Sequence, residues 1–447
     1  MPCRVFARHA ENVASGVPII DLDLTPPGAE RAPLSWRRRL TPARPVLVGA
    51  VVLLALALLG GAASAGRTLT HVLSADPQPA AAFVLSDDSL FTASFGDPAI
   101  RRWRLADAAL SWTAELPQTA QDLVYDEASR VLMARSGIDP NVSFLDADTG
   151  AVLWRNESPD IAVVTMGGGR VLLQTNVAES RRALRLVDAR TGRPVWSRVV
   201  DSTGYFDPGD YLPGRAPARL IAVDTAGHAV VLQYSDGSVL AEGDLDVDFP
   251  AQTNNAFGAD FATIATVGDV LYVSRRDRGV STLTAWSIDS VTRRWQVTGG
   301  PAGYVVDCGP VICVAEDGLV SALDPADGRV LWQRQGLGIA FRYDDRSLLA
   351  YDESENPEAM LLDPRTGAVR LRLRLGRVVQ LGDVLLRADS VRIGRNWVEA
   401  ADDDGVLHVV GALDTAVASR CASRGSYLAC ATSTGATQVW RIPSHLT

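Results

Sequence analysis

From about Leu69 to the C-terminus, short apolar stretches alternate with turns rich in glycine, aspartate and proline. The apolar stretches are rich in valine, leucine, isoleucine and threonine, as in "IAVVTMG" and "GRVLLQTN". This part of the chain shows no sustained 3.6-residue periodicity of the kind that indicates an amphipathic helix. The pattern therefore predicts an all-β domain over residues 67–447.

One earlier segment differs, because residues 45–66 ("PVLVGAVVLLALALLGGAASAG") carry no charge. A helix of about 20 such residues spans the hydrocarbon core of a bilayer. Four arginines lie between positions 37 and 44, and by the positive-inside rule they keep the N-terminus in the cytoplasm. We therefore predict an uncleaved transmembrane signal anchor that places residues 67–447 outside the cytoplasm. The alternatives are a signal peptide cleaved near Ala63–Ala65 and a buried soluble helix.

Residues 1–44 are dominated by proline, glycine and charge, and they contain no apolar periodicity. Such a composition is typical of a disordered segment, here a cytoplasmic tail. The stretch "IIDLDL" (residues 19–24) is a candidate for a short binding motif. Its alternative is a chance apolar pair in an inert tail.

A motif of eleven residues recurs in the all-β part. Its strong copies are "FLDADTGAVLW", "LVDARTGRPVW", "ALDPADGRVLW" and "LLDPRTGAVRL", each with an aspartate, a glycine four residues later, and an aromatic residue or leucine four after that. These positions are Asp146, Gly150 and Trp154; Asp188, Gly192 and Trp196; Asp324, Gly328 and Trp332; and Asp363, Gly367 and Leu371. Three weaker copies end at Trp112, Ala241 and Trp295, and a fourth lies near Val409.

Each copy predicts one β-hairpin. The aspartate side chain hydrogen-bonds the backbone of the turn, and the glycine supplies a positive φ. The following strand carries the tryptophan, which we expect to be buried between neighbouring units. Two further short strands precede each hairpin, and four strands in about 40 residues are typical of a β-propeller blade.

Counting units gives eight or nine, and we predict a propeller of about eight four-stranded blades, with nine as the alternative. The C-terminal stretch from Val417 to Pro443 supplies only three strands, and "RTLTHVL" (residues 67–73) is predicted to provide the fourth and close the ring. Closure removes the exposed sheet edges that an open array would leave.

The "LDxxTGxxxW" unit resembles the repeat of the pyrroloquinoline-quinone (PQQ) family of propellers, the quinoprotein dehydrogenase-like repeat, over roughly residues 80–445. The arrangement of tail, anchor and propeller also resembles uncharacterised membrane proteins of high-GC Gram-positive bacteria. The same repeat occurs in the scaffold lipoprotein of the outer-membrane assembly machinery, but nothing here matches that protein's lipobox cysteine. For a quinone-dependent dehydrogenase, the resemblance implies adjacent cysteines, central calcium ligands and a longer chain. No two cysteines here are adjacent.

Candidate sites for chemistry are few. If Asp146 is position 1 of a calcium loop, Glu157 falls at position 12, as such a loop requires, but Gly150 falls at position 5 rather than 6. The turn interpretation is therefore favoured, and we predict no catalytic, cofactor-binding or metal site. The net charge of -9 argues against a nucleic-acid partner.

Four of the five cysteines follow the predicted anchor, in the oxidising compartment, and form two close pairs. Cys308 and Cys313 flank one predicted turn, and Cys421 and Cys430 flank another. We predict two local disulfides across hairpins, with free core thiols and metal binding as alternatives. Cys3, in the tail, is expected to stay reduced.

Two functions remain open at this point. The favoured one is a non-catalytic, membrane-tethered scaffold that binds a protein or a cell-envelope component outside the cytoplasmic membrane. The alternative is a propeller that binds a quinone or another small ligand, as an enzyme or a sensor. The insertions Asp201–Gly214 and Phe249–Ala259 lengthen two repeats, and such loops are the expected place for recognition residues.

Overall fold

The structure is a computed structural model. It describes residues 68–75, 78–137, 141–178, 181–201, 205–207, 216–247, 261–353, 358–373, 378–381, 384–388, 395–401, 407–414 and 416–443. They lie in one compact unit, Ala65–Thr447. The predicted tail (1–44) and the predicted transmembrane segment (45–66) fall outside the described residues. Within the described ranges, no helix has the length and hydropathy needed to cross a membrane.

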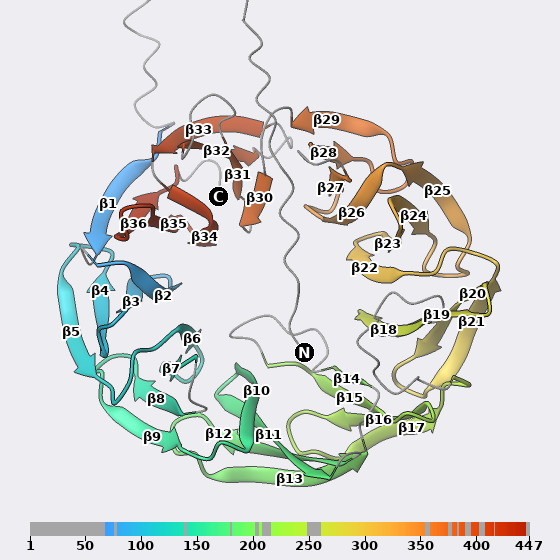
Figure 1. The fold of residues 1–447 in the computed structure, drawn as a ribbon, viewed down its shortest axis with the longest axis horizontal. Coiled ribbons are helices and arrows are strands. Elements are labelled where there is room, and N and C mark those ends of the chain that lie inside the picture. Colours follow the sequence, from blue (N-terminus) through green and yellow to red (C-terminus); the bar gives the residue numbers. More distant parts are fainter. Residues whose placement is uncertain are drawn as a thin grey trace, which may run out of the picture. The chain divides into compact units, whose positions relative to one another are not determined.

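The described residues form nine four-stranded antiparallel sheets, which follow one another as the blades of a ring (Figure 1). Within a blade, neighbouring strands in the sheet are neighbours in the sequence, apart from one strand of the last blade. Each blade is therefore built from hairpins, with its first strand innermost and its last strand on the outside of the ring.

The strands have the following bounds. Blades 1 to 3 comprise β2 (Ala80–Leu85), β3 (Ser89–Ser94), β4 (Ala99–Arg104) and β5 (Leu110–Glu115); β6 (Asp122–Asp126), β7 (Val131–Arg135), β8 (Val142–Asp146) and β9 (Val152–Asn156); and β10 (Ile161–Gly167), β11 (Arg170–Ala178), β12 (Arg181–Asp188) and β13 (Pro194–Asp201). Blades 4 to 6 comprise β14 (Tyr205–Asp207), β15 (Arg219–Val223), β16 (His228–Gln233) and β17 (Val239–Asp244); β18 (Phe261–Val267), β19 (Val270–Asp277), β20 (Val280–Ser287) and β21 (Thr292–Thr298); and β22 (Tyr304–Cys308), β23 (Val311–Glu316), β24 (Leu319–Leu323) and β25 (Val330–Gln335). Blades 7 to 9 comprise β26 (Leu337–Arg342), β27 (Leu348–Asp352), β28 (Ala359–Leu362) and β29 (Val369–Leu373); β30 (Val378–Leu381), β31 (Val384–Ala388), β32 (Arg395–Ala401) and β33 (Leu407–Asp414); and β34 (Ala416–Arg424), β35 (Tyr427–Thr432), β36 (Thr437–Arg441) and β1 (Thr70–Ala75).

The last blade joins the two ends of the ring. Strand β1 pairs antiparallel with β36, so that Thr70 lies opposite Arg441. This confirms the prediction that the segment at residues 67–73 completes the C-terminal blade. Because the ring closes by strand pairing, blade 9 contributes no open edge between the first and last repeats.

The predicted number of eight blades is wrong, since the described residues form nine. The eight motif copies lie in blades 1 to 8. Blade 9 carries no motif, because its third and fourth strands, β36 and β1, come from opposite ends of the chain and no turn connects them. The predicted number equals the number of motif copies, so the C-terminal blade, which was itself predicted, adds the ninth.

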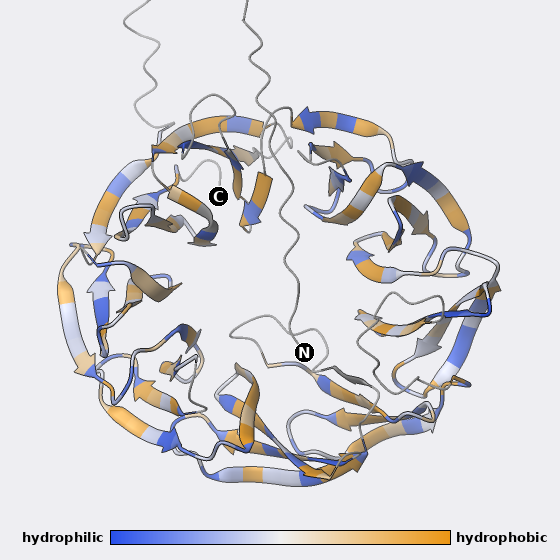
Figure 2. Cartoon of the chain, viewed as in Figure 1, coloured by the Kyte–Doolittle hydropathy of each residue, from blue (hydrophilic) through white to orange (hydrophobic). Residues whose placement is uncertain are grey.

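The core lies between the blades rather than inside any one of them. Nine buried apolar clusters occur among the described residues, and each is shared by two neighbouring blades. In one of them, Phe91 and Ile100 of blade 1 pack with Leu132 and Leu145 of blade 2. Middle strands are covered on both sides, so β3 and β28 are buried throughout. Figure 2 shows apolar residues along many of these inner and middle strands.

At five interfaces a repeat tryptophan connects one blade to the next. The indole N–H of Trp154, in blade 2, donates to the carbonyl of Ala189 in blade 3 at 2.8 Å. A Cβ added to Gly192 would lie 2.9 Å from the Trp154 ring, so the ring sits directly on the glycine backbone. The same contact occurs between Trp112 and Gly150, Trp196 and Gly237, Trp295 and Gly328, and Trp332 and Gly367.

In the four strong copies of the motif, the turn that carries the glycine is closed by the aspartate. Asp363 Oδ1 accepts hydrogen bonds from the backbone N–H groups of Arg365 and Thr366, both at 3.0 Å. The N–H of Gly367 donates to the Asp363 carbonyl at 2.9 Å, and its φ is +66°. Asp146 and Asp188 close their turns in the same way. Asp324 accepts a hydrogen bond from the backbone N–H of Ala326. In this copy Asp327 stands at the position where the other strong copies have threonine.

Arginines help to lower the pKa values of two of these aspartates, Asp363 and Asp146. The hydrogen bond from the Arg370 guanidinium, with those from the turn, keeps the pKa of Asp363 below its usual value. Burial raises the pKa of Asp146, but hydrogen bonds from Arg190 and from its own turn outweigh this effect and lower it. Arg190 belongs to blade 3, so its ion pair with Asp146 also joins two blades.

Both predicted disulfides are present, Cys308–Cys313 and Cys421–Cys430. Cys421 lies directly opposite Cys430 in the β34–β35 pair. Cys313 lies instead opposite Val306, so the first disulfide is diagonal in the β22–β23 hairpin.

Substituting Gly192 by alanine is expected to lower the unfolding free energy by about 2–5 kcal/mol. At positive φ the added Cβ crowds the following carbonyl oxygen, and it would also displace the Trp154 ring. Gly279 is the matched control. Its φ is +79°, but an added Cβ there would meet no atom within 4 Å. Gly279→Ala should therefore show only the backbone cost of about 1–2 kcal/mol. Urea unfolding measures both, and equal losses would contradict a role for the tryptophan contact.

The turn aspartates predict a pH dependence of stability. Asp363 has a folded-state pKa below its ordinary 3.8, so it stabilises the fold at pH values above about 3.8. That contribution disappears as the pH falls from there through the lower folded-state pKa. Asp363→Asn should lower the urea midpoint at pH 7, and the difference from wild type should shrink at pH 3. A difference that stays constant with pH would refute this role, and Asp160→Asn, outside the turns, serves as the control.

Candidate functional site

The links between strands fall on two faces of the ring, because the strands of a blade alternate in direction. The turn face carries the turns from first to second and from third to fourth strand. The linker face carries the turns from second to third strand and the links from one blade to the next. The repeat motif, as a link from third to fourth strand, lies on the turn face.

The predicted turn residues are occupied by structural contacts. Asp148 binds Arg102 at 3.0 Å and also pairs with Arg130. Arg102 is only 8% exposed and donates as well to the carbonyl of Ala147 and to the hydroxyl of Ser89. Nowhere in the described ranges do three or more histidine, cysteine, aspartate or glutamate side chains gather in a way that could hold a metal ion. These ion pairs and hydrogen bonds join blade 1 to blade 2.

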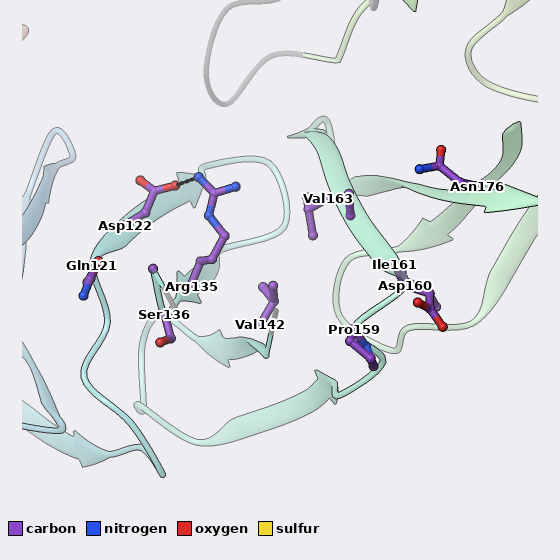
Figure 3. A pocket seen from close by; sticks show the side chains of 12 residues that line it. Gln121, Asp122, Arg135, Ser136, Val142, Pro159, Asp160, Ile161, Val163 and Asn176 are labelled. Atoms are coloured by element: carbon purple, nitrogen blue, oxygen red, sulfur yellow. Dashed lines mark hydrogen bonds and ion pairs between the residues drawn. The ribbon is translucent and has the colours of Figure 1, made fainter. Parts of the chain in front are cut away.

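The linker face has two notable hollows. The larger one, of about 690 Å³, lies between blades 2 and 3 (Figure 3). Asp122 and Arg135 form an ion pair of 2.6 Å on its blade 2 side, across opposed positions of β6 and β7. Ile161 and Asn176 line it from blade 3. A lining of carboxamide, guanidinium and aliphatic groups is suited to binding the surface of a protein or polymer. It does not assemble the groups of one particular reaction.

The smaller hollow, of about 330 Å³, lies at blades 5, 6 and 7, and we call it the acidic hollow. Its lining includes Phe261 and Arg276 of blade 5, Tyr304, Glu316, Asp317 and Gly318 of blade 6, and Gly338 and Glu353 of blade 7.

Contacts inside the acidic hollow fix several of its groups. Arg276 forms an ion pair with Glu316, and its guanidinium carbon lies 5.5 Å from the centre of the Phe261 ring. Glu316 also accepts the N–H of Ala302 at 3.1 Å. A Cβ added to Gly303 would lie 2.1 Å from the Ala315 carbonyl oxygen, so only glycine allows β22 to begin this close to β23.

Neither hollow is marked by a motif in the sequence. Arg276, Glu316 and Glu353 lie at or next to the end of the second strand in three successive blades, about one repeat apart, and the ring brings them together. The recognition loops predicted at Asp201–Gly214 and Phe249–Ala259 lie almost wholly outside the described residues, which include Asp201 and β14 of the first. Glu157, considered for calcium, lines a minor hollow of about 120 Å³ with Arg155.

Several solved structures are similar to this chain. BamB from Moraxella catarrhalis is 14% identical, with 84% of this chain and 100% of that chain covered and a TM-score of 0.46. A eukaryotic initiation factor is 12% identical, with 81% and 95% covered and a TM-score of 0.54. Sqt1 from Saccharomyces cerevisiae is 10% identical, with 84% and 100% covered and a TM-score of 0.44. No curated protein matches the chain.

A match to a family model is more specific than these likenesses of fold. The model described as outer membrane protein assembly factor BamB matches residues 101–334 and 316–440. These ranges run from within blade 1 to β36. Because they cover well over half of the chain and coincide with its blades, the chain belongs to this family of repeat propellers.

Proposed function

We propose that the chain is a non-catalytic scaffold, tethered to the membrane by residues 45–66, whose propeller binds a protein or a cell-envelope component outside the cytoplasmic membrane. The observation that carries the proposal is the division of the ring into two faces. On the turn face, the charged groups of the repeat are engaged between blades. The linker face presents two hollows with mixed polar and apolar linings.

Family membership supports the scaffold reading, since the matched model is described as an assembly factor. The two disulfides support a location outside the cytoplasm, because thiols there are oxidised and cytoplasmic thiols are kept reduced. The uncharged segment at 45–66, preceded by arginines, supports a tether with the N-terminus inside.

The proposed topology predicts the reactivity of Cys3. The other four cysteines are paired in disulfides, so Cys3 is the single thiol expected to react. A charged maleimide, which does not cross the bilayer, should leave the protein unlabelled in intact cells and label it fully after permeabilisation. Cys3→Ser is the control and should remain unlabelled in both. Labelling of Cys3 in intact cells would rule out a cytoplasmic tail.

Partner binding is tested by crosslinking the full-length protein in its native membranes. We expect reproducible enrichment of the same partner, and its loss in Asn176→Arg, which places a long charged side chain at the larger hollow. Ala326→Arg makes the same change at an exposed position of the turn face and should retain the partner. If no partner is recovered, and PQQ with calcium raises the melting temperature in a concentration-dependent way, the small-ligand function replaces the scaffold.

A further inference from the structure

We infer that the acidic hollow receives a positively charged side chain, arginine or lysine, from the protein partner. The inference rests on the proposed function, since it names the chemistry of one contact on the linker face. It depends on three features of the hollow: its unbalanced charge, its held carboxylate and its aromatic wall.

The charge of the hollow is unbalanced. Among the residues that the structure describes, its lining contains three carboxylates, Glu316, Asp317 and Glu353, but a single guanidinium, that of Arg276. Arg276 is engaged by Glu316. Within the described part of the chain, no arginine forms an ion pair with Asp317 or Glu353, and both residues are exposed. Two negative charges therefore remain to attract a cation from outside.

One of the two remaining carboxylates is held against the neighbouring blade. A Cβ on Gly318 would lie 2.0 Å from Glu353 Oε2, so the Glu353 side chain of blade 7 rests on the turn of blade 6. The Asp317 side chain projects from that same turn, whose φ values of +43° at Asp317 and +74° at Gly318 are those of the tight two-residue hairpin turn that favours Asp-Gly. Little side-chain freedom is lost when a ligand meets a group that is already held, as Glu353 is, and this favours binding.

The aromatic wall suits a cation with a long apolar stem. Tyr304 is 46% exposed at the hollow. Next to it, the Phe261 ring already carries the guanidinium of Arg276, which shows that this wall accommodates such a group. Aromatic faces attract arginine and lysine, and exposed tyrosines are frequent at binding hot spots. A cavity of about 330 Å³ admits one long side chain but no folded element.

The binding test uses full-length protein in detergent and the fluorescently labelled peptide acetyl-Gly-Ser-Arg-Ser-Gly-amide. A second peptide carries citrulline, the neutral isostere of arginine. We expect the arginine peptide to bind at least about tenfold more tightly, as the loss of a charged hydrogen-bonded pair implies. Glu353→Gln combined with Asp317→Asn should abolish this preference, whereas Glu242→Gln, at an exposed position of β17 in blade 4, should preserve it. Equal binding of the two peptides, or no binding, would overturn the inference.

Gly338→Trp tests the hollow without changing charge. Gly338 lines it, and an added Cβ would meet no atom within 4 Å, so the indole should fill the space while the fold is kept. An unchanged circular dichroism spectrum and melting temperature would verify this. We expect loss of peptide binding and weaker crosslinking of the native partner. If wild type and Gly338→Trp recover the same partner equally, the inference fails but the scaffold stands. If wild type recovers none, the scaffold itself fails.

Discussion

The contact between a tryptophan and the glycine of the next blade is the constraint on which the rest of the ring depends. At five interfaces the indole lies on a glycine of positive φ and donates its N–H to a carbonyl of the same turn. The contact fixes the distance and the angle between two blades. It also explains why the motif pairs tryptophan and glycine at fixed positions: the tryptophan of one repeat needs the glycine of the following repeat.

The charged residues of the repeat motif also have structural roles. The aspartates close turns and pair with arginines of the same or the next blade. Motifs that look like ion sites in the sequence are therefore part of the frame. Binding chemistry is left to the linker face, where turns between second and third strands and blade-to-blade links do not repeat, and where both larger hollows lie.

Much of the fold was predictable because its signals are local. The hairpin at Asp146–Trp154 follows from residue types within eleven positions, and so does each further copy. The closing strand was predictable as well, since three C-terminal strands leave an edge that needs a partner. The blade number was not, because β36 and β1 have no turn between them and so no motif. The disulfides illustrate both cases: sequence proximity pairs the cysteines correctly, but only the register makes Cys308–Cys313 diagonal.

The sequence by itself determined the all-β class, the repeat, the family resemblance and both disulfide pairs, since each rests on residues close together in the chain. The tertiary structure alone decided the ninth blade, the two faces and the hollows. The acidic hollow shows why. Arg276, Glu316 and Glu353 belong to three successive blades, at or next to the end of each second strand. Their spacing of about one repeat places them on the same face, but it does not show that they share one hollow. Their meeting depends on how closely the inner strands of adjacent blades approach, which is set by packing between blades and not by any local pattern.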